Sequence, residues 1–120
     1  MAKILVIDDE KPIRSLLRAV LESDHHQVFE AANGRLGLEL YRERSVDLII
    51  TDLVMPEMDG FDFISELTRS TAQVKVIAMT GDSDAIIRLA TTQWLGARQI
   101  LRKPFELDTL LDMVRYELAR

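Results

Sequence analysis

The chain contains no cysteine, so disulfide bonds and thiolate metal sites are excluded. Its two histidines, His25 and His26, are neighbours in the sequence, which does not match the ligand spacing of a zinc site. No run of basic residues occurs, and 15 Lys and Arg against 20 Asp and Glu give a formal net charge of -5. This charge balance argues against direct binding of nucleic acid or of an anionic membrane by the chain itself.

Long apolar runs are also absent. The longest runs have the length of a strand, far below the about 20 residues that a membrane-spanning helix needs, and the N-terminus lacks the pattern of a signal peptide. No repeat, low-complexity tract or linker interrupts the 120 residues, of which 48% are hydrophobic. We therefore expect one cytoplasmic domain, over residues 1–120, with a substantial core.

Five short, unbroken apolar runs predict five strands, and the segments between them have helical periodicity. The expected strands cover residues 3–7, 27–30, 47–51, 74–79 and 99–101, and the expected helices cover residues 13–21, 36–44, 61–69, 86–95 and 107–118.

Regular alternation of strands and helices predicts an α/β fold, and the continuous apolar runs indicate strands that are buried on both faces of a parallel sheet. Five such units predict a doubly wound, flavodoxin-like domain: a five-stranded parallel sheet of strand order 2-1-3-4-5 with five helices. In this architecture ligands bind outside the carboxyl ends of the strands, at the switch point between strands 1 and 3.

Chemically capable side chains follow four of the expected strands. Asp8 and Asp9 follow the first, Asp52 the third, Thr80 the fourth and Lys103 the fifth. Each residue alone is compatible with an ordinary turn, but together they would meet at one edge. Because the acids outnumber the base, a hard divalent cation such as Mg²⁺ would balance them. Since Mg²⁺ is usually held by one or two carboxylates plus phosphate oxygens, such a site also implies a phosphate.

Four segments of the chain resemble the receiver domains of two-component response regulators. The segments are ILVIDDE at 4–10, DLIITDLVMPEMDG at 47–60, VKVIAMTG at 74–81 and LGARQILRKPF at 95–105. They occur in order, with spacing close to that of the family, and the resemblance covers essentially the whole chain.

The resemblance implies that Asp52 accepts a phosphoryl group from a histidine kinase or a histidine phosphotransfer protein. It also implies a Mg²⁺ site, in which Mn²⁺ can substitute, with Asp9, Asp52 and the backbone carbonyl of Val54 as direct ligands. Asp8 would act mostly through a bound water. We expect Glu10 to face solvent or the start of the first helix, without a ligand role.

Further roles follow from the same resemblance. Thr80 would donate its hydroxyl to the phosphoryl group, and Lys103 would pair first with Asp52 and then with a phosphoryl oxygen. The Lys103–Pro104 peptide bond would be cis, and Gly60 would let the backbone turn around the site. The chain would thus catalyse its own phosphorylation and dephosphorylation without being a turnover enzyme.

Phosphorylation would remodel the surface of the fourth helix, fifth strand and fifth helix, and so control an unidentified output partner or effector domain. Many receivers carry Tyr or Phe where this chain has Ile100, and we expect Ile100 and Trp94 to lie near the output surface. In the fourth helix one apolar stripe runs from Ile87 to Trp94, whereas Ile86 and Leu89 lie outside it, and one face should meet the sheet.

Three alternative functions fit the sequence less well. A haloacid-dehalogenase-type phosphatase or phosphotransferase needs a second Asp two residues after its nucleophile, where this chain has Val54. A flavin-binding module would have its phosphate repelled by Asp8 and Asp9. A receiver fold used only as an interaction module would not need the full set of acids, hydroxyl and amine.

Overall fold

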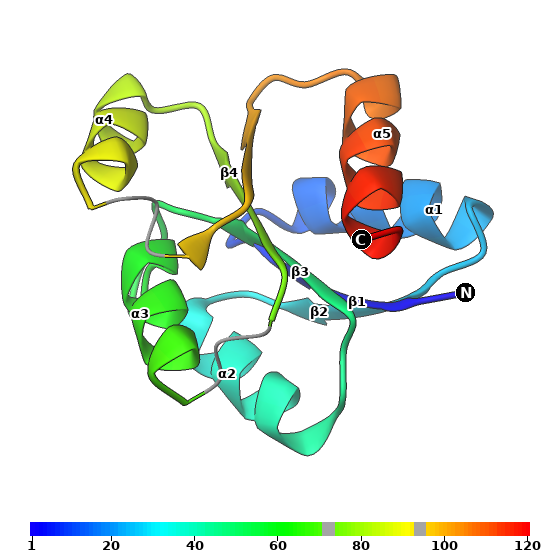
Figure 1. Cartoon of the computed structure of the whole chain (residues 1–120), viewed down its shortest axis with the longest axis horizontal. Helices are drawn as coiled ribbons and strands as arrows, with labels where there is room; N and C mark the ends of the chain where they lie inside the picture. The colour runs from blue at the N-terminus through cyan, green and yellow to red at the C-terminus, as the bar shows by residue number, and fades with distance from the viewer. Residues whose placement is uncertain (71–73, 93–95) are drawn as a thin grey trace.

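The computed structural model describes residues 1–70, 74–92 and 96–120. Within these residues a single sheet of five parallel strands has the order β2-β1-β3-β4-β5, and five helices accompany it (Figure 1). The predicted fold class and strand order are therefore confirmed. The elements are β1 (Lys3–Ile7), α1 (Lys11–Ser23), β2 (Gln27–Ala31), α2 (Gly34–Glu43), β3 (Leu48–Asp52), α3 (Gly60–Ser70), β4 (Val76–Thr80), α4 (Ser83–Thr91), β5 (Gln99–Arg102) and α5 (Leu107–Leu118).

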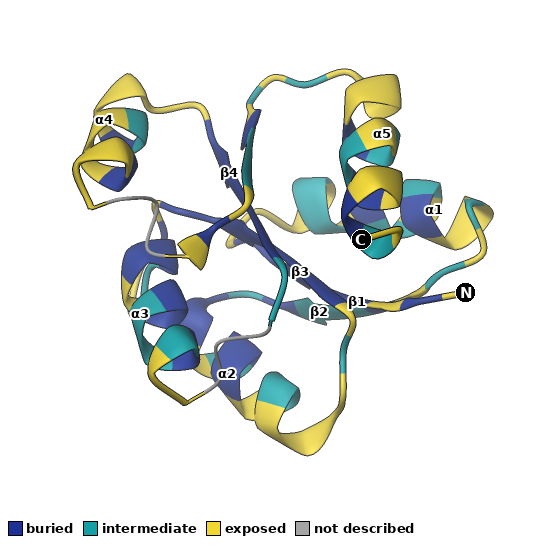
Figure 2. Cartoon of the chain, in the orientation of Figure 1, coloured by how far each residue is buried: buried dark blue, intermediate teal, exposed yellow. Residues whose placement is uncertain are grey.

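Helices cover both faces of the sheet, as Figure 1 shows. Helices α1 and α5 pack on one face, where Leu17, Leu21, Leu110 and Val114 join one apolar cluster. Helices α2, α3 and α4 contribute to the cluster on the other face. Every residue of β3 and β4 is buried, which explains why these strands are continuous apolar runs rather than alternating ones (Figure 2).

Local capping signals set where several helices begin. Pro12 occupies the first turn of α1, a position where the missing backbone N–H costs no hydrogen bond. Asn33 caps α2, and its Oδ1 accepts a hydrogen bond of 2.9 Å from the backbone N–H of Leu36. Asp82 caps α4 in the same way, through Asp84 N. Each of these helices follows a parallel strand, so the capped helix starts lie at the carboxyl edge of the sheet.

Helix α4 differs from its sequence-based prediction. It begins at Ser83, three residues before the expected start, because Asp82 caps it, and the expected end at 93–95 lies outside the described residues. Its buried residues are Ala85 and Leu89, whereas Ile87 in the stripe noted above is 61% exposed. The face that meets the core is thus the one outside that stripe.

No helix in the described ranges is long and apolar enough to cross a membrane.

Candidate functional site

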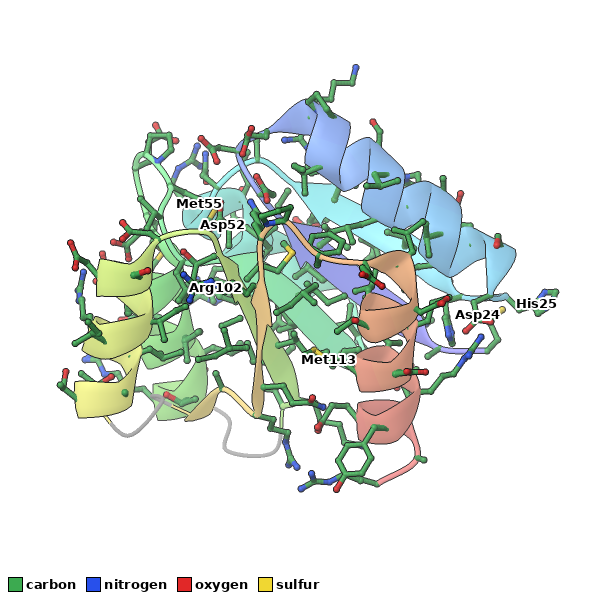
Figure 3. All side chains as sticks on the ribbon, turned by 90° about the horizontal axis from the view of Figure 1, so that it is seen from above. Asp24, His25, Asp52, Met55, Arg102 and Met113 are labelled. Atoms are coloured by element: carbon green, nitrogen blue, oxygen red, sulfur yellow. The ribbon has the colours of Figure 1, made fainter. Side chains whose placement is uncertain are left out.

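The polar residues that the sequence placed after the strands meet at one edge of the sheet. Asp52 and Thr80 are the last residues of β3 and β4, and Lys103 follows β5 directly. The register of the parallel strands aligns these ends, since Asp52 pairs with Met79 and Thr80 with Arg102. Figure 3, which looks at the molecule from above, shows Asp52 at this edge. The sheet thus brings together side chains from distant parts of the sequence.

Lys103 is the cation at the centre of this group. Its Nζ lies 2.6 Å from Asp8 Oδ2 and 3.2 Å from Asp52 Oδ2, and 3.8 Å from Glu10 Oε1. The predicted pairing of Lys103 with Asp52 is present, but the shorter contact is with Asp8. Such charge-assisted hydrogen bonds are stronger than neutral ones, so Lys103 holds the ends of β1 and β3 together.

Burial shapes the protonation of this group. Asp8 is fully buried and Asp52 is 6% exposed. Burial raises the pKa of Asp52 above its ordinary value, and the negative charge of Asp8 raises it further. These two effects together outweigh the positive charge of Lys103, which lowers the pKa. For Lys103 burial alone would lower the pKa, but the hydrogen bond to Asp8 and the charges of both acids outweigh it, and the net pKa is raised. Lys103 therefore remains charged at neutral pH.

Oxygen ligands for a hard cation gather beside this pair. Carboxylate oxygens of Asp8, Asp9 and Glu10 lie within 4.8 Å of one another. Asp8 already receives Lys103 on Oδ2 and the backbone N–H of Glu10 on Oδ1, at 2.9 Å. Asp9 is exposed, and no ion pair within the described ranges engages its carboxylate. An all-oxygen acidic set of this kind fits Mg²⁺.

Glu10 takes part in this cluster more directly than its sequence position indicated. As expected, it stands at the start of α1, as the residue before the helix, and its side chain is 62% exposed. However, its carboxylate lies close enough to Asp8 and Asp9 to share a cation with them. The sequence did not reveal this proximity, because a single solvent-facing acid next to Asp8 and Asp9 belongs to no periodic pattern.

The backbone after β3 turns tightly around the site. Val54 N–H lies 3.4 Å from Asp52 Oδ1, and the Val54 side chain is 53% exposed. Gly60 N–H donates to the carbonyl of Leu53 at 3.1 Å, which brings the start of α3 against the end of β3. A Cβ on Gly60 would lie 2.1 Å from the Asp52 carbonyl oxygen. Glycine is therefore required here by close approach of two backbone segments.

Thr80 and Lys103 are linked through the backbone. Lys103 N–H donates to the carbonyl of Thr80 at 2.9 Å, and the Lys103–Pro104 peptide bond is cis, as expected. The Thr80 side chain is buried, and its Oγ1 accepts the backbone N–H of Asp82 at 3.0 Å. The hydroxyl proton of Thr80 is left free to donate to another acceptor.

The structure describes one of the two residues expected at the output surface. Ile100 on β5 is half-buried and packs against the apolar cluster under α2, α3 and α4. Trp94 lies outside the described residues. Near Ile100, Arg102 Nη2 donates to Ser83 Oγ at 2.9 Å and so connects the end of β5 with the first residue of α4.

Sequence reasoning missed Arg14, which supports the acidic loop from α1. Its Nη1 donates to the backbone carbonyl of Asp8 at 2.7 Å, and its Nε donates to Glu30 at 3.2 Å. Glu30 lies on β2 and also binds Arg18. The available signal in the sequence was the pair of arginines Arg14 and Arg18 in the predicted first helix, but such charged pairs are common on solvated helix faces.

The fold and this acidic edge match one family. The chain belongs to the response regulator receiver domain family, whose profile matches residues 4–115. It is 35% identical to sporulation initiation phosphotransferase F of Bacillus subtilis, over 94% of this chain and 90% of that protein. It is 38% identical to the KDP operon transcriptional regulatory protein KdpE of Escherichia coli, over the whole chain but only 52% of that protein.

Solved structures of the same class are similar over the whole fold. A receiver domain protein from Clostridium thermocellum has a TM-score of 0.92 and 34% identity, with 100% of this chain and 96% of that chain covered. The response regulator TrrA from Thermotoga maritima, crystallised in complex with Mg²⁺-BeF, has a TM-score of 0.88 and 30% identity, with 98% of this chain and 99% of that chain covered. The chain is thus a receiver domain of the two-component response regulator class.

Proposed function

We propose that this receiver domain is a phospho-acceptor switch in which Asp52 takes a phosphoryl group from a phosphohistidine on a histidine kinase or histidine phosphotransfer protein. An Asp52 oxygen attacks phosphorus while the bond from phosphorus to the imidazole nitrogen breaks, and the departing imidazole keeps the electron pair. The observation that carries the proposal is the contact of Lys103 Nζ with both Asp8 and Asp52. It sets a fixed positive charge beside the nucleophile, where phosphoryl oxygens need neutralisation.

The acids at this edge are proposed to hold Mg²⁺, or Mn²⁺ in its place. Asp9, Asp52 and the carbonyl of Val54 would be direct ligands, and Asp8, whose Oδ2 accepts from Lys103, would act mostly through a water. Bound Mg²⁺ supplies charge neutralisation on the phosphoryl oxygens. The acidic cluster contains Asp9 but not Asp52; together with the similarity to TrrA, crystallised with Mg²⁺-BeF, it supports a cation at this edge of the sheet.

Lys103 and Thr80 complete the proposed site. Lys103 keeps Asp8 as its partner and directs a second N–H from Asp52 to a phosphoryl oxygen. Thr80, whose oxygen accepts from Asp82, donates its hydroxyl proton to the same group. Hydrolysis resets the switch: water attacks phosphorus, the bond to the Asp52 oxygen breaks, and inorganic phosphate leaves. The domain thus catalyses changes to its own state rather than turnover of a separate substrate.

The output is proposed to pass through the face formed by α4, β5 and α5. Movement of Thr80 toward the phosphoryl group would alter the loop into α4 and the Arg102–Ser83 hydrogen bond at its first residue. Ile100 and Trp94 are the proposed contact residues for the output partner or effector domain. The net charge of -5 favours a protein partner over direct binding of nucleic acid.

The test is incubation of the purified chain with acetyl phosphate, with and without Mg²⁺, followed by intact mass measurement. A mass increase of one phosphoryl group is expected with Mg²⁺ and is expected to vanish in Asp52→Asn. Asp112→Asn, which alters an exposed acid on α5, is the matched control and should be phosphorylated like the wild type. Phosphorylation that persists in Asp52→Asn would overturn the assignment.

A further inference from the structure

The side chain of Asn33, the residue that caps α2, accepts one hydrogen bond and donates another. It is 8% exposed, and its Oδ1 accepts the Leu36 N–H as the helix cap. Its Nδ2 donates to Glu57 Oε2 at 2.6 Å, across 24 residues of sequence. The cap requires only the oxygen, since serine or aspartate would serve equally well there. The amide nitrogen is therefore what distinguishes asparagine at this position.

Glu57 lies in the loop between β3 and α3 and has an unusual backbone conformation. Its φ is +63°, in the left-handed region that favours glycine. The next residue of the same loop, Met58, accepts a 2.8 Å hydrogen bond on its carbonyl from Gly34 N–H, and a Cβ on Gly34 would lie 2.4 Å from that oxygen. Two consecutive residues at the start of α2, the cap Asn33 and the first helical residue Gly34, thus hold two consecutive residues of this loop.

The held loop, residues 53–59, carries a proposed metal ligand. It begins directly after Asp52 and includes Val54, and the hydrogen bond from Gly60 N–H to the carbonyl of Leu53 closes its base. Gly60 thus fixes the base of the loop, Asn33 and Gly34 hold its far side, and Val54 lies between these attachments in the sequence.

We infer that Asn33 is a positioning residue for Mg²⁺: by holding Glu57 it fixes the loop at 53–59 and aims the Val54 carbonyl at the cation. The inference rests on the proposed function, because it concerns the affinity of the same metal site. Asn33 acts through Glu57, because its side chain hydrogen-bonds to Leu36 and Glu57 and not to Asp8, Asp9 or Asp52. Partners that orient metal ligands in this way commonly control metal affinity.

The central variant is Asn33→Asp in the full chain, with Mg²⁺ binding measured by calorimetry in the absence of a phosphodonor. The substitution keeps an oxygen for the cap, removes the amide donor and sets a carboxylate against Glu57. We expect the Kd for Mg²⁺ to rise about tenfold. The added negative charge by itself would lower that Kd, so a rise identifies the loss of positioning rather than an electrostatic effect.

The rescue variant exchanges donor and acceptor. In the double variant Asn33→Asp with Glu57→Gln the new amide at position 57 can donate to the new carboxylate at position 33, and the net charge equals that of the wild type. We expect its Kd for Mg²⁺ to return to within about twofold of the wild-type value. Glu57→Gln alone keeps an oxygen acceptor for Asn33 and is the matched control, expected to bind like the wild type.

Asn33→Ser provides a second route if Asn33→Asp does not fold. It is neutral, keeps a capping oxygen and lacks the amide donor, so it should also weaken Mg²⁺ binding. Unchanged affinity in the folded Asn33 variants, or a double variant no better than Asn33→Asp, would overturn the inference while the wild type still binds Mg²⁺. A wild-type chain that binds no Mg²⁺ would overturn the proposed metal site and this inference together.

Discussion

Lys103 and Asp8 stand 95 positions apart in the sequence, and Lys103 Nζ lies 2.6 Å from Asp8 Oδ2. The contact joins the loop after β5 to the loop after β1 across the end of β3. Because Asp8 is fully buried, it depends on this ammonium for its counter-charge. The same ammonium reaches Asp52, so the lysine that would serve the phosphoryl group also stabilises the site before phosphorylation.

Replacing Lys103 by Met should lower the metal-free stability of the domain and slow its phosphorylation. Removal of one partner of a buried pair costs about 3 kcal/mol, or roughly 10 °C in Tm for a chain of this size. Added Mg²⁺ should restore more stability to Lys103→Met than it adds to the wild type, because it neutralises the same acids. Thermal unfolding with and without Mg²⁺ checks this. Equal melting temperatures for Lys103→Met and wild type in chelator would contradict it.

Asp52→Asn should raise the metal-free melting temperature at pH 7. The pKa of Asp52 is raised above its ordinary 3.8 by burial and by Asp8, so ionised Asp52 disfavours the folded state. The stability linked to a raised pKa is fully present below the unfolded value and is lost as the pH rises through the folded value. The advantage of Asp52→Asn should therefore shrink as the pH falls through the folded value of the pKa, and it should be lost below the unfolded value of about 4.

Thermal unfolding between pH 3 and 7 measures this effect, with Asp112→Asn as the control for loss of an exposed carboxylate. An advantage of Asp52→Asn that did not change with pH would contradict the assigned direction of the shift.

Thr80→Val should separate phosphoryl uptake from the conformational response. The substitution removes the oxygen that accepts Asp82 N–H, which should cost about 1 kcal/mol of stability. Asp52 should still gain a phosphoryl group, but the amide signals of the loop into α4 should shift much less on phosphorylation than in the wild type. Heteronuclear NMR with acetyl phosphate measures both. Thr80→Ser retains the hydroxyl and should respond normally; a full response in Thr80→Val would exclude the role assigned to the hydroxyl.

Gly60→Ala should damage both stability and phosphorylation. The new Cβ would lie 2.1 Å from the Asp52 carbonyl oxygen and 2.8 Å from Leu53 Cα, so backbone next to the nucleophile must move. A loss of about 2 kcal/mol or more is expected, with slower phosphorylation. Gly81→Ala is the comparison, because its Cβ would approach Lys103 backbone only to 3.4 Å. Chemical unfolding and intact mass distinguish them, and equal behaviour of the two variants would refute the argument.

Much of the architecture could be predicted from the order of local patterns in the sequence. Continuous apolar runs separated by helical stripes predict buried parallel strands with crossover helices, and few arrangements satisfy that alternation. The end of each run then places Asp8, Asp52, Thr80 and Lys103 at one edge. These inferences succeed because they need only strand direction and order, which the chain connectivity constrains strongly.

Other features depended on packing between distant segments. The periodicity of the sequence allowed either of two faces of α4 to meet the core. Only the packing of the folded protein shows that Ala85 and Leu89 are buried there, whereas Ile87 is exposed. Similarly, the choice of Asp8 as the closer partner of Lys103 depends on ångström-scale loop placement.

The fold class, the strand order and the identity of the side chains at the carboxyl edge follow from local periodicity and connectivity, and the sequence is enough to predict them. The pairing of these groups, the depth at which Asp8 is buried and the hydrogen bond from Asn33 to Glu57 are set by tertiary packing. Such contacts join residues that are far apart in the chain, and their distances depend on the combined packing of every element between them.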